Sequence, residues 1–531
     1  MARIESIEIE NFRSIGEEPL LIDFPKNSPL ILVGENNAGK SNIVRAIELI
    51  FGEYHPKYKS LDDFDYFERN PKNKITINAK VTGIINKFGY NNYSCGGFYF
   101  TAEKNKENEF LGLQNEDGVY NKYVANLMRE ELICVSVNSE QNLSYQLSYS
   151  SKFTLLSKVT KAFHEKLSSD EEKVNRLKAV FETIKETFLE VDEFRLFSEN
   201  MSHIAGQMIT NMSHALNFDF SAYDPSNYYK TLRVHPAENG EIRTYEELGT
   251  GQQQILALTF AHAYAKSFLG QGIIFILDEP ESHLHPLAQK WLANQMYKMA
   301  EDGLQLVITT HSPYFINLEY LSGIYIVSKD NQTRVSNTNA SNLVELCHST
   351  GAPKADEKTI LPFYSAHSKP SILNGFFAKK IILVEGETEE LALPYYFQKV
   401  GLDTLKEGIA IIGVGGKGNL SKWWRLFKIL NIPVFICFDN DDRGDLKKLN
   451  RTEALKAIGI DDGDIASLLT CQDWNINGNF CVFGVDFEKT MKSSFTKYQE
   501  YEDNETSRLG NSKPIVARAV AKLLFDLRQS N

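Results

Sequence analysis

The hydrophobic and polar positions near the start of the chain predict a strand, a loop and a helix. Residues 4–9 alternate apolar and polar side chains, as in a half-buried β-strand. Residues 28–33 form a short apolar run, and residues 42–51 carry a helical pattern. The segment between these last two contains two glycines and a lysine. We therefore expect a glycine-containing loop that connects a buried strand to a helix.

The middle of the chain changes from a β pattern to a helical one. Residues 75–150 contain strand-like runs separated by polar turns, and residues 153–216 are helical. This helical arm either packs on the protein core or dimerises, and the pattern alone slightly favours packing on the core. Its apolar residues recur at steps of three and four, at Val174, Leu177, Val180, Phe181, Ile184, Phe188 and Val191.

A second α/β pattern begins at Lys379. Three apolar runs, KKIILVEG, EGIAIIGVGG and IPVFICFDND, alternate with helical segments. This alternation predicts a parallel sheet. The preceding residues, 328–375, are polar or weakly patterned, and we expect a linker with short helices there.

Composition narrows the class of protein. Of the 531 residues, 42% are hydrophobic and 24% are charged, as in ordinary globular proteins. No apolar run approaches the ~20 residues that span a bilayer, and the opening residues lack the apolar core of a signal peptide. The six cysteines form no C-x-x-C pair. We expect a cytoplasmic protein without a membrane partner. The net charge of -12 argues against a globally basic DNA coat protein.

Residues 34–41 read G-E-N-N-A-G-K-S and match the phosphate-binding loop pattern G-x-x-x-x-G-K-S. The glycines let backbone N–H groups approach phosphates, the lysine reaches the β- and γ-phosphates, and the serine hydroxyl can ligate Mg²⁺. A turn without a ligand is the alternative, which the flanking strand and helix disfavour. The predicted ATP-binding residues of this loop are Gly34, Asn36, Asn37, Gly39, Lys40 and Ser41.

A later apolar strand, residues 272–277, ends in two acids. Asp278 is predicted to enter the Mg²⁺ shell of the nucleotide, and Glu279 to polarise the attacking water. Two acids after a strand could simply be solvated. Their occurrence together with the phosphate loop favours the ATPase interpretation.

Two further segments identify the ATPase class. Residues 248–253, LGTGQQ, resemble the signature loop of ABC-type ATPases, and residues 306–313, LVITTHSP, resemble their switch-histidine strand. In such proteins two heads sandwich ATP, so at least a dimer of heads is implied. The resemblance assigns ATP contacts to Gly249, Gly251 and Gln252, and a catalytic role to His311.

The segment PESHLHP also invites a metal interpretation, through Glu281, His283 and His285. The match to ABC-type heads of the chromosome-maintenance and recombination-repair kind is better. We therefore disfavour a metal site at these three residues.

Acidic residues end two strands of the C-terminal pattern. Glu385 follows the first strand, Asp439 and Asp441 end a later one as D-x-D, and Glu389 lies one helical turn after Glu385. Ends of parallel strands meet at one crevice, where clustered carboxylates need a hard cation such as Mg²⁺. The pattern resembles the Toprim fold of topoisomerases, primases and certain nucleases. The turn at 413–419 could bring backbone amides and its lysine to a phosphate.

Together these features resemble the OLD ("overcoming lysogenization defect") family, in which an ABC ATPase precedes a Toprim nuclease. The resemblance covers nearly the whole chain and implies metal-dependent DNA endonuclease activity, often in antiviral defence against phage. It implies ATP and Mg²⁺, or Mn²⁺ at the nuclease site, as cofactors. Its implied partners are DNA and a second copy of the chain, with a defence-system protein or nucleic acid left open.

The resemblance also implies a set of nuclease residues. Lys513 would add positive charge on the scissile phosphate, and Glu385 would act in catalysis as well as in metal binding. A solvated acidic turn and a lysine at a helix start remain alternatives for the late positions. The implied metal ligands are Glu385, Glu389, Asp439, Asp441 and one of Asp486 and Glu488.

The expected fold is therefore α/β. An ABC-type ATPase head with an inserted β-region comprises residues 1–152 and 221–327, interrupted by a helical dimerisation arm at 153–220. The linker at 328–375 leads to a C-terminal Toprim α/β domain at 376–531.

Two other classes of function remain open. One is an ATP-dependent DNA-binding or repair scaffold whose Toprim domain does not cut. The other is a topoisomerase or primase, but there is no room for a DNA-gate domain and no cysteine pattern for a zinc module. The complete acid set of Glu385, Asp439 and Asp441 favours the nuclease over the scaffold.

Overall fold

The computed structural model describes most of the chain as two compact units, Met1–Ser136 with Gly270–Asn531, and Val137–Leu269. No helix in the described part is long and apolar enough to cross a membrane. The described residues are 2–52, 54–86, 93–114, 120–121, 124–138, 154, 156–157, 160, 163, 167–208, 237–238, 241–242, 247–267, 272–282, 284–399, 401–472 and 475–487.

The first unit opens with a six-stranded antiparallel sheet in the order β2-β1-β4-β5-β6-β7. Its first strand departs from the strict alternation that the sequence predicts. A β-bulge between Ile4 and Ser6 shifts the register, so Ile4, Ile7 and Ile9 all face the core. The strands are β1 (Arg3–Glu10), β2 (Leu20–Asp23), β4 (Ile75–Asn86), β5 (Tyr93–Ala102), β6 (Glu109–Gln114) and β7 (Tyr120–Asn121).

A second six-stranded sheet has the order β14-β13-β3-β12-β11-β8. Strands β13, β3, β12 and β11 run parallel, and β14 is antiparallel to β13. Every residue of β3 and β12 is buried, as expected for parallel strands covered on both faces. The strands are β3 (Leu30–Val33), β8 (Leu132–Asn138), β11 (Gly272–Asp278), β12 (Gln305–Thr310), β13 (Ile324–Lys329) and β14 (Thr333–Ser336). The helices of this region are α1 (Lys40–Phe51), α2 (Asn126–Glu130) and α9 (Pro286–Glu301).

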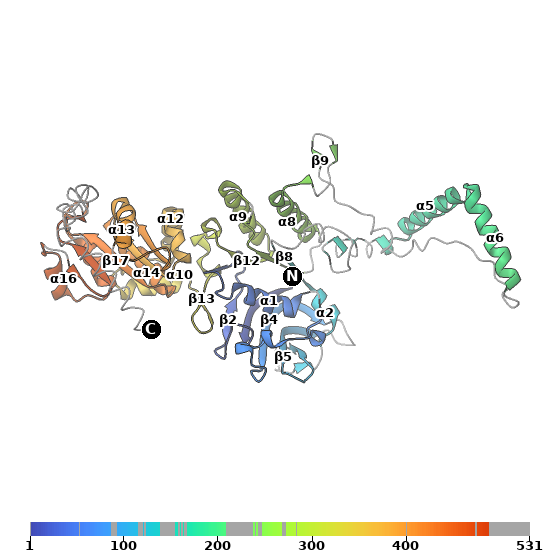
Figure 1. Ribbon diagram of the computed structural model, residues 1–531, viewed down its shortest axis with the longest axis horizontal. Helices are drawn as coiled ribbons and strands as arrows, with labels where there is room; N and C mark the ends of the chain where they lie inside the picture. Colours follow the sequence, from blue (N-terminus) through green and yellow to red (C-terminus); the bar gives the residue numbers. More distant parts are fainter. Residues whose placement is uncertain are drawn as a thin grey trace. The chain divides into compact units, whose positions relative to one another are not determined.

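The second unit contains helices α5 (Glu171–Leu189) and α6 (Asp192–Met208) of the helical arm (Figure 1). Among the described side chains, those of α5 and α6 are not buried, and Val180, Leu196 and Phe197 are more than half exposed, whereas Leu156 and Thr160 earlier in the arm are buried. The described side chains of these two helices therefore do not show the expected packing on the core. The described elements of the unit are α5 (Glu171–Leu189), α6 (Asp192–Met208), α8 (Thr250–Ser267) and the strand pair β9 (Ala237–Glu238) and β10 (Glu241–Ile242).

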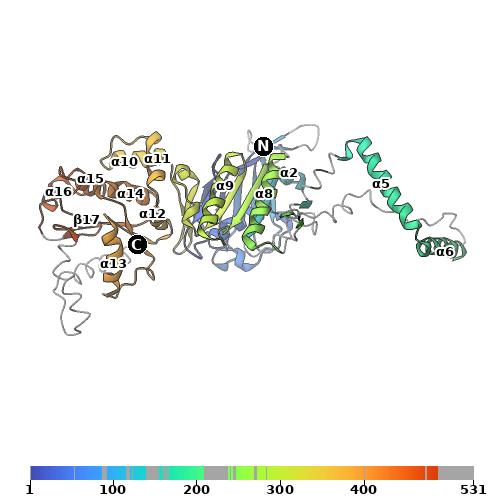
Figure 2. The same ribbon diagram turned by 90° about the horizontal axis from the view of Figure 1, so that it is seen from above.

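The segment expected to be a linker, residues 328–375, contains the expected short helices but is also built into the first unit. Strand β14 lies at the edge of the second sheet. Helices α10 and α11 lie beside α14 (Figure 2). The Tyr364 ring meets the Trp423 ring edge to face, and Arg425 donates to the Thr350 carbonyl at 2.8 Å. The helices are α10 (Ala340–Ser349), α11 (Glu357–His367) and α12 (Pro370–Leu373).

A five-stranded sheet with the order β16-β15-β17-β19-β18 follows, and four of its strands are parallel, as the sequence predicts. Alternate residues face opposite sides. Ile382 and Val384 of β15 pack against Phe397 of α13, whereas α14 contacts the sheet at β15 and β17. The elements are β15 (Lys380–Val384), α13 (Glu387–Lys399), β16 (Ile409–Gly413), α14 (Lys417–Ile429), β17 (Val434–Asp439), α15 (Leu449–Ala457), α16 (Asp462–Leu468), β18 (Asn475–Ile476) and β19 (Phe480–Phe483).

Candidate functional site

The loop of residues 34–41 leaves buried strand β3 and ends at helix α1, as predicted. Gly34 has φ 157°, and a Cβ there would lie 2.1 Å from the Val327 carbonyl oxygen. Gly39 caps α1 with φ 110°, and a Cβ there would lie 2.1 Å from Thr333 Oγ1. Both positions therefore require glycine, and neighbouring strands fix the loop from outside.

Lys40 is buried and folds back over its own loop. Its ammonium group donates to the carbonyl oxygens of Gly34 and Glu35, both at 2.9 Å. Burial lowers the Lys40 pKa, and the charges of Glu279 and Asp278 oppose that shift. Main-chain carbonyls are weak partners for an ammonium, so phosphate oxygens can replace them at low cost.

The two acids after β11 lie beside the end of β12. Thr309 Oγ1 donates to the Asp278 carboxylate, and the Glu279 N–H donates to the Thr309 carbonyl at 3.0 Å. Glu279 has the left-handed φ of 50°, which is uncommon for this residue type. Because β11, β12 and β3 are parallel neighbours, these acids and the phosphate loop meet at one sheet edge.

The predicted switch histidine lies against the predicted base. His311 Nε2 is 3.5 Å from Glu279 Oε1. Burial and then the Lys40 charge lower the His311 pKa, which favours the neutral imidazole. A neutral ring nitrogen beside the carboxylate can orient Glu279 without neutralising it.

Glu281 fastens the switch segment. Its carboxylate accepts from Thr310 Oγ1 at 2.9 Å and from the His311 N–H at 2.6 Å, and burial raises the Glu281 pKa. His285 caps helix α9 by accepting from the Ala288 N–H at 3.3 Å. These roles are structural, so a metal site at PESHLHP gains no support, and His283 lies outside the described residues.

The predicted signature residues lie in the second unit, at the start of α8. The Gly249 N–H donates to Gln252 Oε1 at 3.3 Å, and Gln253 Nε2 donates to the Leu248 carbonyl at 2.9 Å. Gly251 lies in the first turn of α8, where backbone N–H groups lack helical partners. This arrangement could present N–H groups to a phosphate.

The carboxylates predicted at the C-terminal domain lie at one edge of the five-stranded sheet. Glu385 follows β15, and Asp439 is the last residue of β17, its parallel neighbour. Asp486 follows β19, the next parallel strand, and is buried. Glu389 is also buried, and its carboxylate accepts from the Gly386 N–H at 3.2 Å. Glu488 and Lys513 lie outside the described residues.

The crevice carries a strong excess of negative charge around Asp439. Burial, then the charges of Glu389 and Glu385, raise the Asp439 pKa to about 8, although the Phe487 N–H donates to it at 2.8 Å. Burial also raises the Glu385 pKa against the opposing Lys417 charge. Glu385 Oε2 is a buried atom without a hydrogen-bond partner. These oxygen donors fit a hard divalent cation, which would satisfy the orphaned atom and the excess charge.

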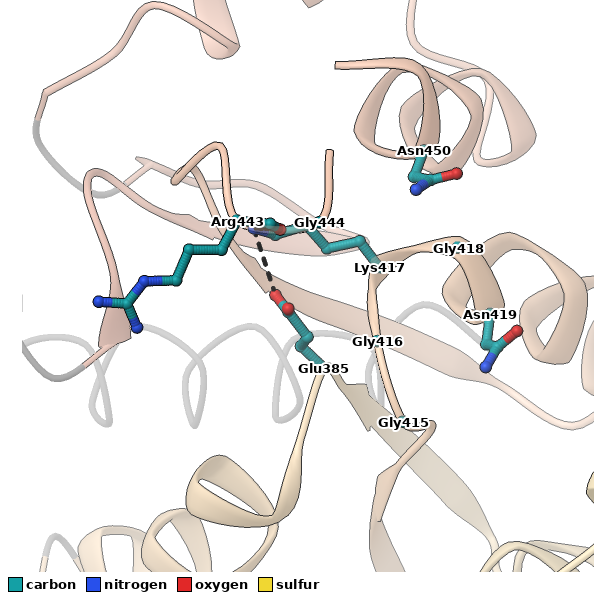
Figure 3. A pocket seen from close by; sticks show the side chains of 9 residues that line it. All are labelled: Glu385, Gly415, Gly416, Lys417, Gly418, Asn419, Arg443, Gly444 and Asn450. Atoms are coloured by element: carbon teal, nitrogen blue, oxygen red, sulfur yellow. Dashed lines mark hydrogen bonds and ion pairs between the residues drawn. The ribbon is translucent and has the colours of Figure 1, made fainter. Parts of the chain in front are cut away.

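Lys417, the first residue of α14, supplies the positive charge that the crevice holds. Its ammonium donates to the Asp441 carboxylate and to the Asp441 carbonyl at 2.9 Å, and lies 3.7 Å from Glu385 Oε2 (Figure 3). Among the described residues, no three His, Cys, Asp or Glu side chains converge as a ready-made metal cage. Asp441 is instead hydrogen-bonded to the Lys417 ammonium.

One supporting residue had no sequence signal. Arg451 is fully buried and donates to the Asn440 carbonyl at 2.6 Å, to Asp442 Oδ1 at 2.6 Å and to Asp445 Oδ2 at 3.2 Å. It therefore holds the loop that carries Asp441. In the sequence it is an ordinary charged residue of a helix.

Comparison with known proteins finds two matching family models and relatives that align over most of the chain. A model described as "AAA ATPase domain" matches residues 3–173 and 100–316, together more than half of the chain. A model described as "Overcoming lysogenization defect protein-like, TOPRIM domain" matches residues 376–441. The "OLD nuclease" of Thermus scotoductus (strain ATCC 700910 / SA-01) is 25% identical over 461 residues, 82% of this chain and 82% of that protein. The "Old nuclease" of Escherichia phage P2 is 22% identical, over 94% of this chain and 90% of that protein.

The fold and the two sites thus define an ATPase domain followed by a Toprim domain. The chain belongs to the AAA ATPase domain family, whose model covers more than half of it, and its residues 376–441 match the OLD-like Toprim model. Among solved structures, an Smc head domain of Pyrococcus furiosus bound to the C-terminal domain of ScpA aligns at 16% identity, over 66% of this chain and 99% of that one, with a TM-score of 0.40. That score is low, so the fold assignment rests on the sheets and the family matches.

Proposed function

We propose that this protein is an ATP-controlled, divalent-metal-dependent DNA endonuclease that acts in anti-phage defence. The observation that supports it best is the position of Glu385 and Asp439 at the ends of neighbouring parallel strands, in the domain matched by the OLD-like Toprim model. The long relatives named OLD nuclease support nuclease chemistry of some kind.

The metal-binding residues would come from three strand ends and one helix. Glu385, Glu389, Asp439 and Asp486 would hold a divalent ion, with Asp441 available to a second one. Such ions activate water and stabilise the charge that develops on a scissile phosphate. The protein groups orient the carboxylates: the Phe487 N–H holds Asp439, and the Gly386 N–H holds Glu389. Glu488 and Lys513 remain candidates from the family pattern alone.

The ATPase site would act through its own residues. Lys40 would bind the β- and γ-phosphates, and Ser41 with Asp278 would bind Mg²⁺. Glu279 would take a proton from the attacking water, because it stands beside a histidine that is favoured in its neutral form.

ATP control would pass through residues that touch both the nucleotide site and the start of the Toprim sheet. Lys379 Nζ is 3.4 Å from Glu35 of the phosphate loop, and the Phe377 ring lies 6.5 Å from the His311 ring. Lys379 immediately precedes β15, Phe377 lies three residues before the strand, and Glu385 follows its last residue. We expect Phe377→Ala to weaken the effect of ATP on DNA cleavage while ATP hydrolysis continues. Unchanged ATP control in that variant would remove this route.

A second copy of the chain would complete the ATP sites and cover the arm. The signature residues at 248–253 act on a neighbouring head in ABC-type ATPases, and apolar side chains of α5 and α6 are exposed in the single chain. Light scattering should give a mass of at least two chains with ATP. A monomer at every concentration tested would contradict the dimer.

Incubation with supercoiled plasmid and Mg²⁺ or Mn²⁺, with and without ATP, tests the proposed activity. Nicked or linear products that disappear with a chelator support the endonuclease. No cleavage of any DNA form with any divalent ion would favour the ATP-dependent DNA-binding scaffold. The defence role is tested by plaque counts on cells that express wild type or Asp439→Ala. Equal counts would contradict a nuclease-based defence.

A further inference from the structure

The carboxylate crevice contains a buried lysine that differs from a surface lysine in how it is held. Only 2% of the Lys417 side chain is exposed. The preceding residues, Gly415 and Gly416, have φ of 75° and 119°, and the Gly416 N–H donates to the Glu385 carbonyl at 2.8 Å. The start of α14 is therefore tied to the end of β15, and it delivers the ammonium to a defined point.

All three ammonium protons have protein acceptors at that point. They are directed to the Asp441 carboxylate, to the Asp441 carbonyl at 2.9 Å and to the Arg443 carbonyl at 3.5 Å. Glu385 Oε2 adds a fourth oxygen at 3.7 Å. The sequence predicts that this lysine could reach a phosphate; in the structure its ammonium protons are directed at protein oxygens instead.

The positive charge is distributed unequally over the crevice. Asp441 has Lys417 and, more weakly, the exposed Arg443, whose Nε lies 3.6 Å from Asp441 Oδ2. Asp439 instead accepts a neutral N–H from Phe487. Of the crevice carboxylates, Asp441 is therefore bonded to the Lys417 ammonium and Glu385 lies 3.7 Å from it, whereas Asp439 is held by a neutral donor.

We propose that Lys417 is a built-in cation that keeps Asp441 paired, so that a first divalent ion binds at Glu385 and Asp439, and an ion that uses Asp441 must displace the lysine. This inference rests on the proposed metal site and adds an order of binding to it. In this scheme Lys417 is a positioning residue: it restrains the loop of Asp441 and makes the second ion weaker than the first.

A phosphate of the DNA would be met by other groups. Arg443, with 82% of its side chain exposed, lines a cavity of about 250 Å³ together with Asn419 and Asn450 (Figure 3). A second ion that arrives with a phosphate ligand could compete with Lys417 better than the ion alone. Measuring metal binding without DNA therefore isolates the effect of Lys417 on the affinity for the second ion.

The test is calorimetric titration of the full-length protein with Mn²⁺ alone, without nucleotide or DNA. In wild type we expect one ion to bind tightly and a second weakly. Asp439→Asn should weaken the first ion by about tenfold or more, and Asp441→Asn should leave it within about twofold, because Lys417 already occupies Asp441.

Lys417→Met should tighten the second ion by about tenfold, since a buried competing charge is gone. The double variant Lys417→Met/Asp441→Asn should lose that gain, and Lys417→Arg should retain weak second binding. Arg443→Met is the matched control, because its exposed charge should change either affinity by less than about twofold.

Three results are decisive. Unchanged or weaker second binding in Lys417→Met would overturn the inference and leave the metal site standing. If Lys417→Met fails to fold, Asp441→Asn provides the test, since that variant keeps the lysine. Loss of first-ion binding in Asp441→Asn would overturn the inference equally. Mn²⁺ binding that is absent in wild type, or unaffected by Asp439→Asn, would overturn the proposed metal site itself.

Discussion

The phosphate loop and the carboxylate crevice use the same local design for different purposes. Lys40 and Lys417 are each the first residue of a helix, and each follows a glycine with positive φ, 110° and 119°. Both ammonium groups are buried and bind main-chain carbonyls. The difference is the carboxylate: Lys417 is paired with Asp441, whereas Lys40 donates to the carbonyl oxygens of Gly34 and Glu35.

This difference explains what each lysine can do. A lysine held by carbonyls gains strongly when phosphate oxygens replace them, because charge-assisted hydrogen bonds are stronger than bonds to neutral acceptors. A lysine that is already paired with a carboxylate has no such gain. Its pairing instead keeps that carboxylate from binding a metal ion. The first lysine suits a nucleotide site, and the second suits a regulated metal site.

The largest effect on DNA cleavage should come from replacing Asp439, the carboxylate that is held by a neutral N–H and not by a lysine. Asp439→Ala should reduce DNA cleavage by about 10³-fold or more, because metal charge stabilisation contributes several kcal/mol. Asp441→Ala should also end cleavage if a second ion is needed. Initial rates of plasmid nicking measure both. Cleavage that persists in both variants would point to another site.

The nucleotide site should respond to its own substitutions. Glu279→Gln should bind ATP but hydrolyse it about 10²–10⁴-fold more slowly, since the water loses its base. Lys40→Ala should lose tight ATP binding. Steady-state ATPase rates and nucleotide binding separate the two effects. A wild-type rate in Glu279→Gln would show that Glu279 is not the base.

The loop that carries Asp441 should depend on Arg451. Arg451→Met leaves the buried Asp445 without this partner, and breaking a buried pair typically costs about 3–5 kcal/mol. Denaturant unfolding measures the loss. Arg443→Met, which removes a guanidinium that is itself exposed, should cost less than about 1 kcal/mol. Equal costs in the two variants would contradict a clamp at Arg451.

A smaller effect should appear in the pH dependence of stability without metal. The Asp439 pKa is raised to about 8 in the folded protein, against about 3.9 in an unfolded chain. Between these values the folded state binds the extra proton, so the stabilisation from this group is full below about 3.9 and is lost as pH rises towards 8.

The melting temperature of the wild type should therefore fall between about pH 5 and pH 8, and that of Asp439→Asn should fall less over the same range. Added Mg²⁺ should restore stability at the upper pH in wild type and not in Asp439→Asn. Identical pH profiles in the two proteins would contradict the assignment to Asp439.

Local sequence was enough to predict some of these features. The phosphate loop is one contiguous segment between a strand and a helix, and the structure shows that context. Glu385 and Asp439 were predicted at parallel strand ends, where the structure places them. Their roles in metal binding stay predictions, as do those of Glu488 and Lys513.

Features that depend on tertiary packing were not predictable. The pair of Lys417 and Asp441 joins residues 24 positions apart and depends on how α14 meets the sheet edge. Glu281 resembled a metal ligand, yet it holds the switch segment through Thr310. The arm pattern could not distinguish internal packing from a surface for a second chain, because either one covers an apolar stripe of a helix; in the structure Val180 and Leu196 of this arm are exposed.

We propose that ATP hydrolysis and DNA cleavage occur at two separate sites of one chain. The most direct test measures both activities on the same preparations of wild type, Glu279→Gln and Asp439→Ala. We expect Asp439→Ala to hydrolyse ATP at close to the wild-type rate without cutting DNA, and Glu279→Gln to keep an intact cutting site. Loss of both activities in a folded Asp439→Ala protein, or DNA cleavage that persists in it, would contradict two separate sites.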